Sequence, residues 1–363
     1  MSRTINFEPI GLRAADDLGL MPTRYHAPHE FCFHLHDTML GILKSAEESR
    51  IADLTVDFAG PDDAQTFAAA PDAFAGFFAL GRADVVQTMV RNQMCLALYA
   101  DMLHFFFEAL RALEKRKFTV ALSLLRKPLK ENLLLIAWLC ADEVDFFEKL
   151  NESPVEHMRS SRLTPDRRRA ILSAAISRIS IGNIFDADVL NSMLFDKKKD
   201  YGLAPLFDMA THLVTHATPA MHTEELNLNF IFKDHRDDDV YRNIYGDLAY
   251  ALAFLLSMQI DLYGRMQPLQ PYHVQWLPLQ SAATYSSLFL SGPNALLRRL
   301  IRTMGEFMNC PYCGARTRVS RAAAPRFLVA EQLSCGTCGQ DHHFPLFWLM
   351  SKSFNAAGRG SRI

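Results

Sequence analysis

The sequence predicts a mainly α protein, in which a bundle-like body of many helices is followed by a small β unit near the C-terminus. Long stretches of the first 297 residues place apolar residues at three- and four-residue steps, the pattern of amphipathic helices. Two Cys-x-x-Cys pairs beside short β-prone runs follow near the C-terminus. Hydrophobic residues make up 49% of the 363 residues and charged residues 21%, which is typical of a globular chain with a sizeable core.

We expect three regions along the chain. Residues 1–297 form the helical body. Residues 298–350 hold a basic helix, the cysteine-bearing unit and an apolar segment that packs back onto the protein. Residues 351–363 form a flexible tail, since terminal residues with little apolar surface to bury are rarely ordered.

The body begins with long helices. One runs from about Pro28 to Ser49, and a second runs from about Arg82 to Lys117, roughly 50 Å at 1.5 Å per residue. A third helix, about Phe118 to Cys140, follows after a short connection, so we expect it to pack antiparallel to the second. Pro128 lies inside the third helix and should kink it, because proline has no backbone N–H to donate.

A single arginine and a single glutamate, Arg126 and Glu131, lie inside this largely apolar third helix. Burying either charge alone would cost on the order of several kcal/mol, so we expect an internal ion pair between them. The alternative is that both take part in catalysis. Further along, the runs Arg167-Arg-Arg169 and Lys197-Lys-Lys199 are either solvated surfaces or contacts for phosphate.

Three histidines suggest a second site. Leu203 to His216 has a helical pattern, which would place His212 and His216 one turn apart on one face, with His222 shortly after. Imidazoles at positions i and i+4 of a helix can share a metal ion, and Glu224 or Glu225 could complete the set. The alternative is that the histidines only form hydrogen bonds. A zinc-protease helix is not supported, because Leu213 stands where that chemistry needs a glutamate.

The last part of the body holds the most apolar helix. It is expected over Val240 to Met266, and its longest apolar run, Ala249 to Met258, is shorter than the roughly 20 residues that span a membrane. We therefore expect a buried helix and no membrane contact. Residues 267–278 are rich in proline and are expected to cross the surface without regular structure.

The cysteine pairs carry the most specific chemistry of the chain. Cys310 and Cys313 form one pair, Cys335 and Cys338 the other, and 21 residues separate the pairs. This spacing is typical of zinc ribbons, in which four thiolates hold one structural Zn²⁺. The glycine after each pair suits a tight turn. We expect a β-hairpin between the pairs, built from residues 317–320 and 327–330.

Charge is distributed unevenly. Residues 298–363 carry ten Lys or Arg against three Asp or Glu, a net charge of +7, whereas the remainder carries 28 against 37, a net charge of −9. A basic C-terminal unit on an acidic body fits contact with nucleic acid or docking of the unit onto the body. The candidate nucleic-acid contacts are the arginines in or beside the expected hairpin: Arg316, Arg318, Arg321 and Arg326.

One segment also carries a resemblance. Leu124-Leu-Arg126-Lys-Pro-Leu-Lys-Glu131-Asn-Leu resembles the Arg/Glu-bearing helix of uncharacterised, all-helical bacterial families. Some of these families are HEPN-like and associated with phage defence, and such proteins often place a histidine at the end of a helix in the position of residues 212–232. The resemblance implies an all-helical fold and a nuclease activity.

Three functions follow as hypotheses. The first is a helical binding protein that contacts nucleic acid or a protein partner through its basic zinc ribbon, in a bacterial defence or regulatory system. The second is a metal-dependent or HEPN-like nuclease that uses the His212/His216 region with Arg126 or Glu131. The third is a scaffold with purely structural zinc. The odd total of seven cysteines favours a reducing cytoplasm, and the sequence leaves a homo-oligomer open.

Overall fold

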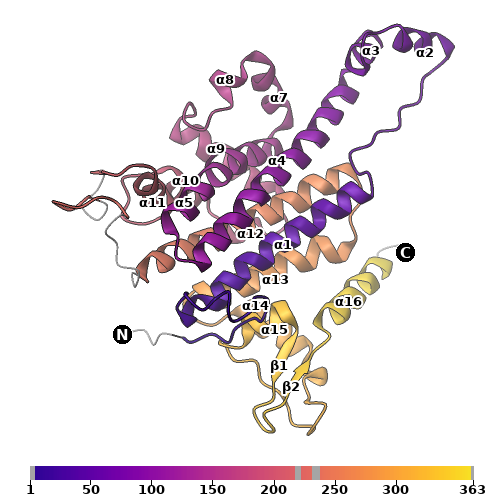
Figure 1. The fold of residues 1–363 in the computed structure, drawn as a ribbon. Helices are drawn as coiled ribbons and strands as arrows, with labels where there is room; N and C mark the ends of the chain where they lie inside the picture. Colours follow the sequence, from indigo (N-terminus) through magenta and orange to yellow (C-terminus); the bar gives the residue numbers. More distant parts are fainter. Residues whose placement is uncertain (1–4, 217–221, 231–237, 361–363) are drawn as a thin grey trace.

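The computed structural model describes residues 5–216, 222–230 and 238–360. The described part is mainly helical, with one two-stranded sheet near the C-terminus, so the predicted fold class is confirmed (Figure 1). The helices of the body are η1 (Thr23–Tyr25), α1 (His26–Glu48), α2 (Pro61–Ala68), α3 (Ala73–Ala79), α4 (Ala83–Glu114), α5 (Phe118–Lys127), η2 (Pro128–Asn132), α6 (Leu133–Ala141), α7 (Glu143–Glu152), α8 (Pro154–His157), α9 (Pro165–Arg178), η3 (Gly182–Ile184), α10 (Ala187–Phe195), α11 (Leu203–Thr211), α12 (Asp239–Met266) and α13 (Pro271–Phe289).

The remaining elements form what we call the C-terminal module, residues 295–360. They are α14 (Ala295–Thr303), η5 (Gly305–Phe307), α15 (Ala324–Ala330), β1 (Gln332–Ser334), β2 (Asp341–His343) and α16 (Leu346–Gly360). Strands β1 and β2 pair antiparallel, with Leu333 opposite His342. A flexible tail was expected from residue 351, but α16 continues to Gly360, since no proline interrupts the chain after Pro345.

Helix α12 is the centre of the body, packed against α1, α6, α11 and α13. Its residues Ala249 to Met258 are buried on every side, which confirms the predicted buried helix. Polar side chains fix the packing: Tyr99 of α4 donates a 2.8 Å hydrogen bond to the Leu255 carbonyl, and Gln259 donates a 3.0 Å bond to the Met39 carbonyl of α1. In the part of the chain described, no helix has the length and apolar character needed to cross a membrane.

Pro128 interrupts the helical path between α5 and α6, as predicted. Residues Pro128–Asn132 form a π-helical turn, η2, in which the Leu133 N–H donates to the Pro128 carbonyl five residues earlier. The expected internal pair of Arg126 and Glu131 is not what forms. Arg126 is exposed, and the Glu131 carboxylate accepts hydrogen bonds from the backbone and hydroxyl of Ser160. Residues 126 and 131 are five positions apart, whereas side chains on a helix meet at i, i+3 or i, i+4, and Ser160 takes the carboxylate instead.

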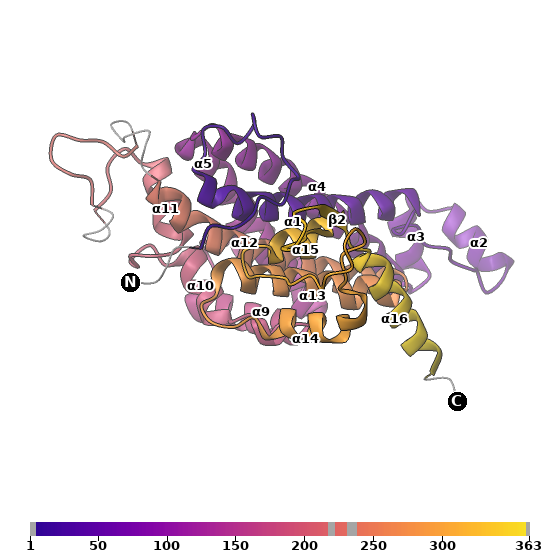
Figure 2. The ribbon, with the colours of Figure 1, turned by 90° about the horizontal axis from the view of Figure 1, so that it is seen from below.

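The prediction of an irregular surface crossing over residues 267–278 was wrong, because helix α13 begins at Pro271 and contains Pro278. Proline is favoured in the first turn of a helix, which explains Pro271. Burial outweighs the lost hydrogen bond at Pro278, since Tyr272 and Trp276 lie one turn apart and both are buried. Figure 2 shows α13 beside α14, α15 and α16. These elements share a second hydrophobic core, made by Trp276, Leu297, Phe327, Leu328, Leu333, Phe344, Leu346 and neighbours.

An N-terminal segment joins the body to this module. The buried carboxylate of Glu30 accepts hydrogen bonds from four consecutive backbone N–H groups, those of residues 10–13, at 2.7 to 3.1 Å. Just before them, the Glu8 N–H donates a 3.1 Å hydrogen bond to the Ala322 carbonyl of the module. Residues 8–13 therefore contact both the helical body and the C-terminal module.

Candidate metal centre

The four paired cysteines meet at one point. Their sulfur atoms all lie within 4.8 Å of one another, and the Sγ–Sγ distances Cys310–Cys338 and Cys313–Cys335 are both 3.7 Å. Four sulfurs at about 2.3 Å from a tetrahedral Zn²⁺ would lie about 3.8 Å apart. The cluster therefore fits a metal ion of this size, and among the described residues it is the one such group of three or more potential ligands.

The two cysteine pairs adopt the same turn. The Gly314 N–H donates to the Cys310 carbonyl and the Gly339 N–H to the Cys335 carbonyl, both at 2.9 Å. Each glycine is left-handed, with φ of +70° and +72°. Open space surrounds both positions, so glycine is favoured there for its backbone freedom rather than for its size. We call the turns the first knuckle (residues 309–317) and the second knuckle (residues 334–341).

The backbone also favours thiolate at the cluster. The N–H groups of Cys338 and Thr337 lower the pKa of Cys335 to about 6. The Ala315 backbone acts in the same direction on Cys313, but burial and hydrogen bonds shared with the other three thiols raise the pKa of Cys313 to about 12. A metal cation would replace this sharing of protons by four ionic bonds, since thiolate is the ligand form of cysteine.

The predicted hairpin between the cysteine pairs was wrong in both strands, and residues 317–320 have no regular secondary structure. Residues Ala324–Ala330 form helix α15, and the two strands flank the second knuckle instead. Helix α15 starts with Pro325 in its first turn and buries Phe327 and Leu328 completely. Gln280 of α13 holds its end through a 2.6 Å hydrogen bond to the Leu328 carbonyl. The sequence pattern of a short apolar run fits a strand and a buried helix equally well. Packing against α13, which is remote in sequence, therefore decides that residues 324–330 form a helix.

The four candidate arginines divide into two pairs. Arg321 donates hydrogen bonds to the carbonyls of Ser287, Leu290 and Gly292, which docks the module onto the end of α13. Arg326 forms ion pairs with Asp341 at 2.9 Å and Glu8 at 3.8 Å. In contrast, Arg316 and Arg318 are exposed, and no ion pair within the described residues includes either of them.

More exposed positive charge lies beside the first knuckle. Helix α14 exposes Arg298, Arg299 and Arg302. The Arg316 guanidinium lies next to Gly305, where a Cβ would be 3.1 Å from it, so the first knuckle adjoins the C-terminal end of α14. Tyr312, between the first two cysteines, is 66% exposed. We call the surface formed by Arg298, Arg299, Arg302, Tyr312, Arg316 and Arg318 the basic face.

The helical face expected for His212 and His216 does not exist. Helix α11 ends at Thr211, His212 is already extended, and His212, His216 and His222 are all exposed. Residues 213–215 form hydrogen bonds with residues 223–229 instead, among them Asn229 N–H to the Leu213 carbonyl at 2.8 Å. The β-branched residues Val214 and Thr215 favour this extended backbone.

Arg126 and Glu131 lie on the wall of a hollow of about 590 Å³, which none of those histidines lines. Lys130, Arg159 and Ser160 lie on the same wall, and no local sequence motif marked them as site residues. The basic run Arg167-Arg-Arg169 was a signal for this hollow, because Arg168 also lines it.

Comparisons of the chain with protein-family models, with curated proteins and with solved structures gave no match.

Proposed function

We propose that this protein binds single-stranded nucleic acid through the basic face of its C-terminal module, and that one structural Zn²⁺ maintains that face. The observation that supports the proposal is that Arg316 and Arg318 are both exposed, as is Tyr312. Tyr312 and Arg316 lie in the first knuckle, and Arg318 follows it directly. Arginine binds phosphate oxygens in bidentate geometry, and a tyrosine ring can stack on an unpaired base.

The zinc would have a structural role. Four cysteine ligands complete the tetrahedral coordination of Zn²⁺, so no position is left for water or substrate. Its task is to hold the first knuckle, and with it Arg316 and Arg318, in a fixed conformation. A reducing compartment such as the cytoplasm would keep the four thiols available for the metal.

Fluorescence anisotropy with labelled 20-nucleotide single-stranded DNA, single-stranded RNA and duplex DNA tests the proposal. We expect the single strands to bind best, with an affinity that falls as salt rises. Changing Arg316→Glu and Arg318→Glu together should remove about two phosphate contacts and reduce the slope of log K against log salt by about 1.4. The matched control is Arg82→Glu with Arg169→Glu, which changes two arginines of the helical body with exposed side chains, one just before α4 and one in α9.

Two results would contradict the proposal. One is the absence of binding to any of the three nucleic acids at low salt. The other is an equal loss of affinity in both double variants, because the effect would then depend on net charge and not on the basic face.

A protein partner is the second candidate. Helix α16 exposes Phe347 and Trp348, at 52% and 56% of their surface, on the outside of the module. Exposed aromatic side chains of this kind often anchor protein interfaces. The resemblance to HEPN-like, phage-defence-associated families stays a prediction, as do the nuclease and the homo-oligomer.

A further inference from the structure

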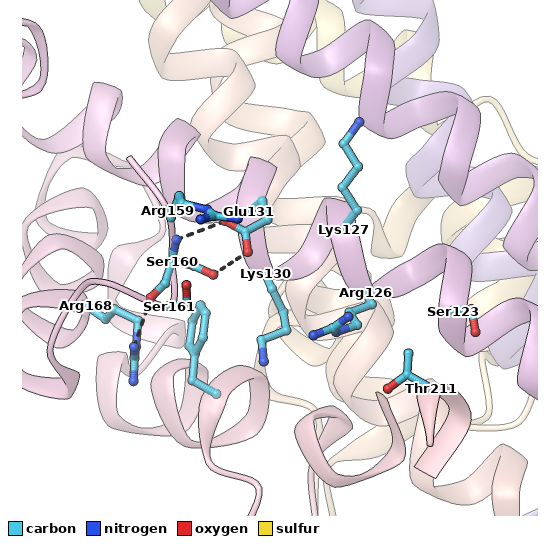
Figure 3. A pocket seen from close by; sticks show the side chains of 11 residues that line it. Ser123, Arg126, Lys127, Lys130, Glu131, Arg159, Ser160, Ser161, Arg168 and Thr211 are labelled. Carbon is cyan, nitrogen blue, oxygen red and sulfur yellow. Dashed lines mark hydrogen bonds between the residues drawn. The ribbon is translucent and has the colours of Figure 1, made fainter. Parts of the chain in front are cut away.

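A second charged site lies on the body, in the hollow of about 590 Å³ shown in Figure 3. Its walls come from six segments: α5, η2, the loop before α9, and helices α9, α10 and α11. The lining residues are Ser123, Arg126, Lys127, Lys130, Glu131, Arg159, Ser160, Ser161, Arg168, Phe195 and Thr211.

The wall of the hollow is fixed before any ligand arrives. On one side, Glu131 of η2 accepts hydrogen bonds from the backbone N–H of Ser160, at 3.0 Å, and from its hydroxyl. On the other side, Arg168 of α9 donates to the carbonyls of Leu163 and Ser160, at 2.7 and 3.2 Å. The loop that carries Arg159 and Ser161 is thus held from both sides, and a binding site that is already ordered loses little entropy on binding.

Positive charge in the hollow is in excess. Lys127 pairs with Asp101 at 2.7 Å and points away from the other side chains (Figure 3). The four remaining cations, Arg126, Lys130, Arg159 and Arg168, occur in none of the ion pairs within the described residues, and Glu131 is the one carboxylate of the lining. Clustered charges of one sign repel, so this arrangement favours an anion as ligand.

The pKa of Lys130 reflects the same excess of positive charge. Burial, followed by repulsion from Arg126, Lys197 and Arg168, lowers the pKa of Lys130 to about 8, against a weaker opposite effect of Glu131. The Phe195 ring partly offsets the repulsion, because its centroid lies 4.6 Å from the Arg168 guanidinium and 5.5 Å from the Lys130 ammonium. Hydroxyl groups of Ser123 and Ser161 add neutral donors to the lining, whereas the Thr211 hydroxyl already donates to the Phe207 carbonyl at 2.8 Å.

We propose that this hollow binds a small molecule that carries two or more phosphoryl groups, such as a nucleoside diphosphate or triphosphate. Four cations match the charge of such a ligand, and arginine, lysine and hydroxyl groups all donate to phosphate oxygens. The volume lies within the range of small-molecule sites, about 300–1,000 Å³. This site is separate from the basic face and does not depend on the function proposed for it.

Isothermal titration calorimetry of the full chain tests the proposal, with inorganic triphosphate, ATP and adenosine as probes. We expect triphosphate and ATP to bind and adenosine, which has no phosphate, to give no heat. Lys130→Gln should weaken both anions about tenfold or more, because it removes a charged hydrogen bond, and adding Arg126→Gln should weaken them further. Lys127→Gln is the matched control and should stay within about twofold, since Asp101 already holds that lysine.

A second measurement guards against misfolding. ATP should raise the melting temperature of the wild type and of Lys127→Gln, but not of the Lys130→Gln, Arg126→Gln double variant, whose own melting temperature should not fall because two repelling charges are gone. The proposal is overturned if neither triphosphate nor ATP binds, or if Lys127→Gln loses as much affinity as Lys130→Gln. It is also overturned if an unlabelled 20-nucleotide strand displaces ATP, which would assign the hollow to nucleic acid.

Discussion

The substitution Cys313→Ser tests whether metal binding is what orders the first knuckle. Residues 309–317 bury little surface, because only Cys310, itself a potential ligand, and Thr317 are buried in that stretch. Their order depends on a few backbone hydrogen bonds, such as Cys310 N–H to the Ala315 carbonyl at 2.8 Å and Thr317 N–H to the Met308 carbonyl at 2.8 Å. Without the metal, little opposes the chain entropy of this stretch.

The magnitudes support that conclusion. Ordering about nine residues costs roughly 9–18 kcal/mol of backbone entropy. Three backbone hydrogen bonds return about 1.5–4.5 kcal/mol. This difference is similar to the apparent binding free energy of structural zinc, about 10–16 kcal/mol. Helix α15 is different, because Phe327 and Leu328 are fully buried, which contributes about 1.5–3 kcal/mol each. Cys313→Ser should therefore open the first knuckle and leave α15 and the helical body folded.

Hydrogen–deuterium exchange measures this directly, together with elemental analysis of zinc. In Cys313→Ser we expect less than one zinc per chain, fast exchange over residues 309–317, and unchanged protection in α15 and α12. Tyr312→Ser is the control, since it changes an exposed side chain of the same knuckle that is not a ligand. Two results would show that metal binding does not order the first knuckle. One is wild-type protein that holds no zinc when purified without chelator, and the other is a variant that exchanges like the wild type over residues 309–317.

Two further predictions concern the buried carboxylates of the body. Glu30→Gln should lower the free energy of unfolding by about 3–5 kcal/mol in urea titrations, because the amide nitrogen cannot accept from the backbone N–H groups of residues 10–13; a loss below about 1 kcal/mol would contradict this. For Glu114, burial raises the pKa, but hydrogen bonds from His29 and Arg13 outweigh it, and the pKa lies below its usual 4.5. A carboxylate with a lowered pKa stabilises the fold above pH 4.5, and this stabilisation is lost as the pH falls. The urea midpoints of wild type and Glu114→Gln should therefore converge toward pH 3. A difference that stays constant with pH would contradict this prediction.

Local signals in the sequence were enough for much of the fold. The break in α-helical hydrogen bonding at Pro128 and the buried helix around residues 249–258 follow from signals in the nearby sequence. So does the gathering of the four cysteines, whose spacing is itself the signal. The errors lie where distant residues decide. Phe327 joins a helix because α13 buries it, and His212 leaves a helix because residues 223–229 pair with the next stretch.

The candidate sites show the same division. The ligands of the metal centre are close in sequence, and so they could be read from it. The hollow draws on side chains from Ser123 to Thr211, and only the packing of α5, α9, α10 and α11 brings them together. Arg126 and Glu131 were singled out for their apolar surroundings, yet their expected pairing was wrong because Ser160, from the loop before α9, donates to the Glu131 carboxylate.

The hydrogen bond from Glu8 to Ala322 also has a consequence in time. During synthesis on a ribosome, residues 8–13 are made about 300 residues before their partner on the module. Glu30 can bind the backbone of residues 10–13 early, but the Glu8 N–H has to wait for Ala322. Docking of the C-terminal module therefore completes the N-terminal segment, and two stretches far apart in sequence reach their final state together.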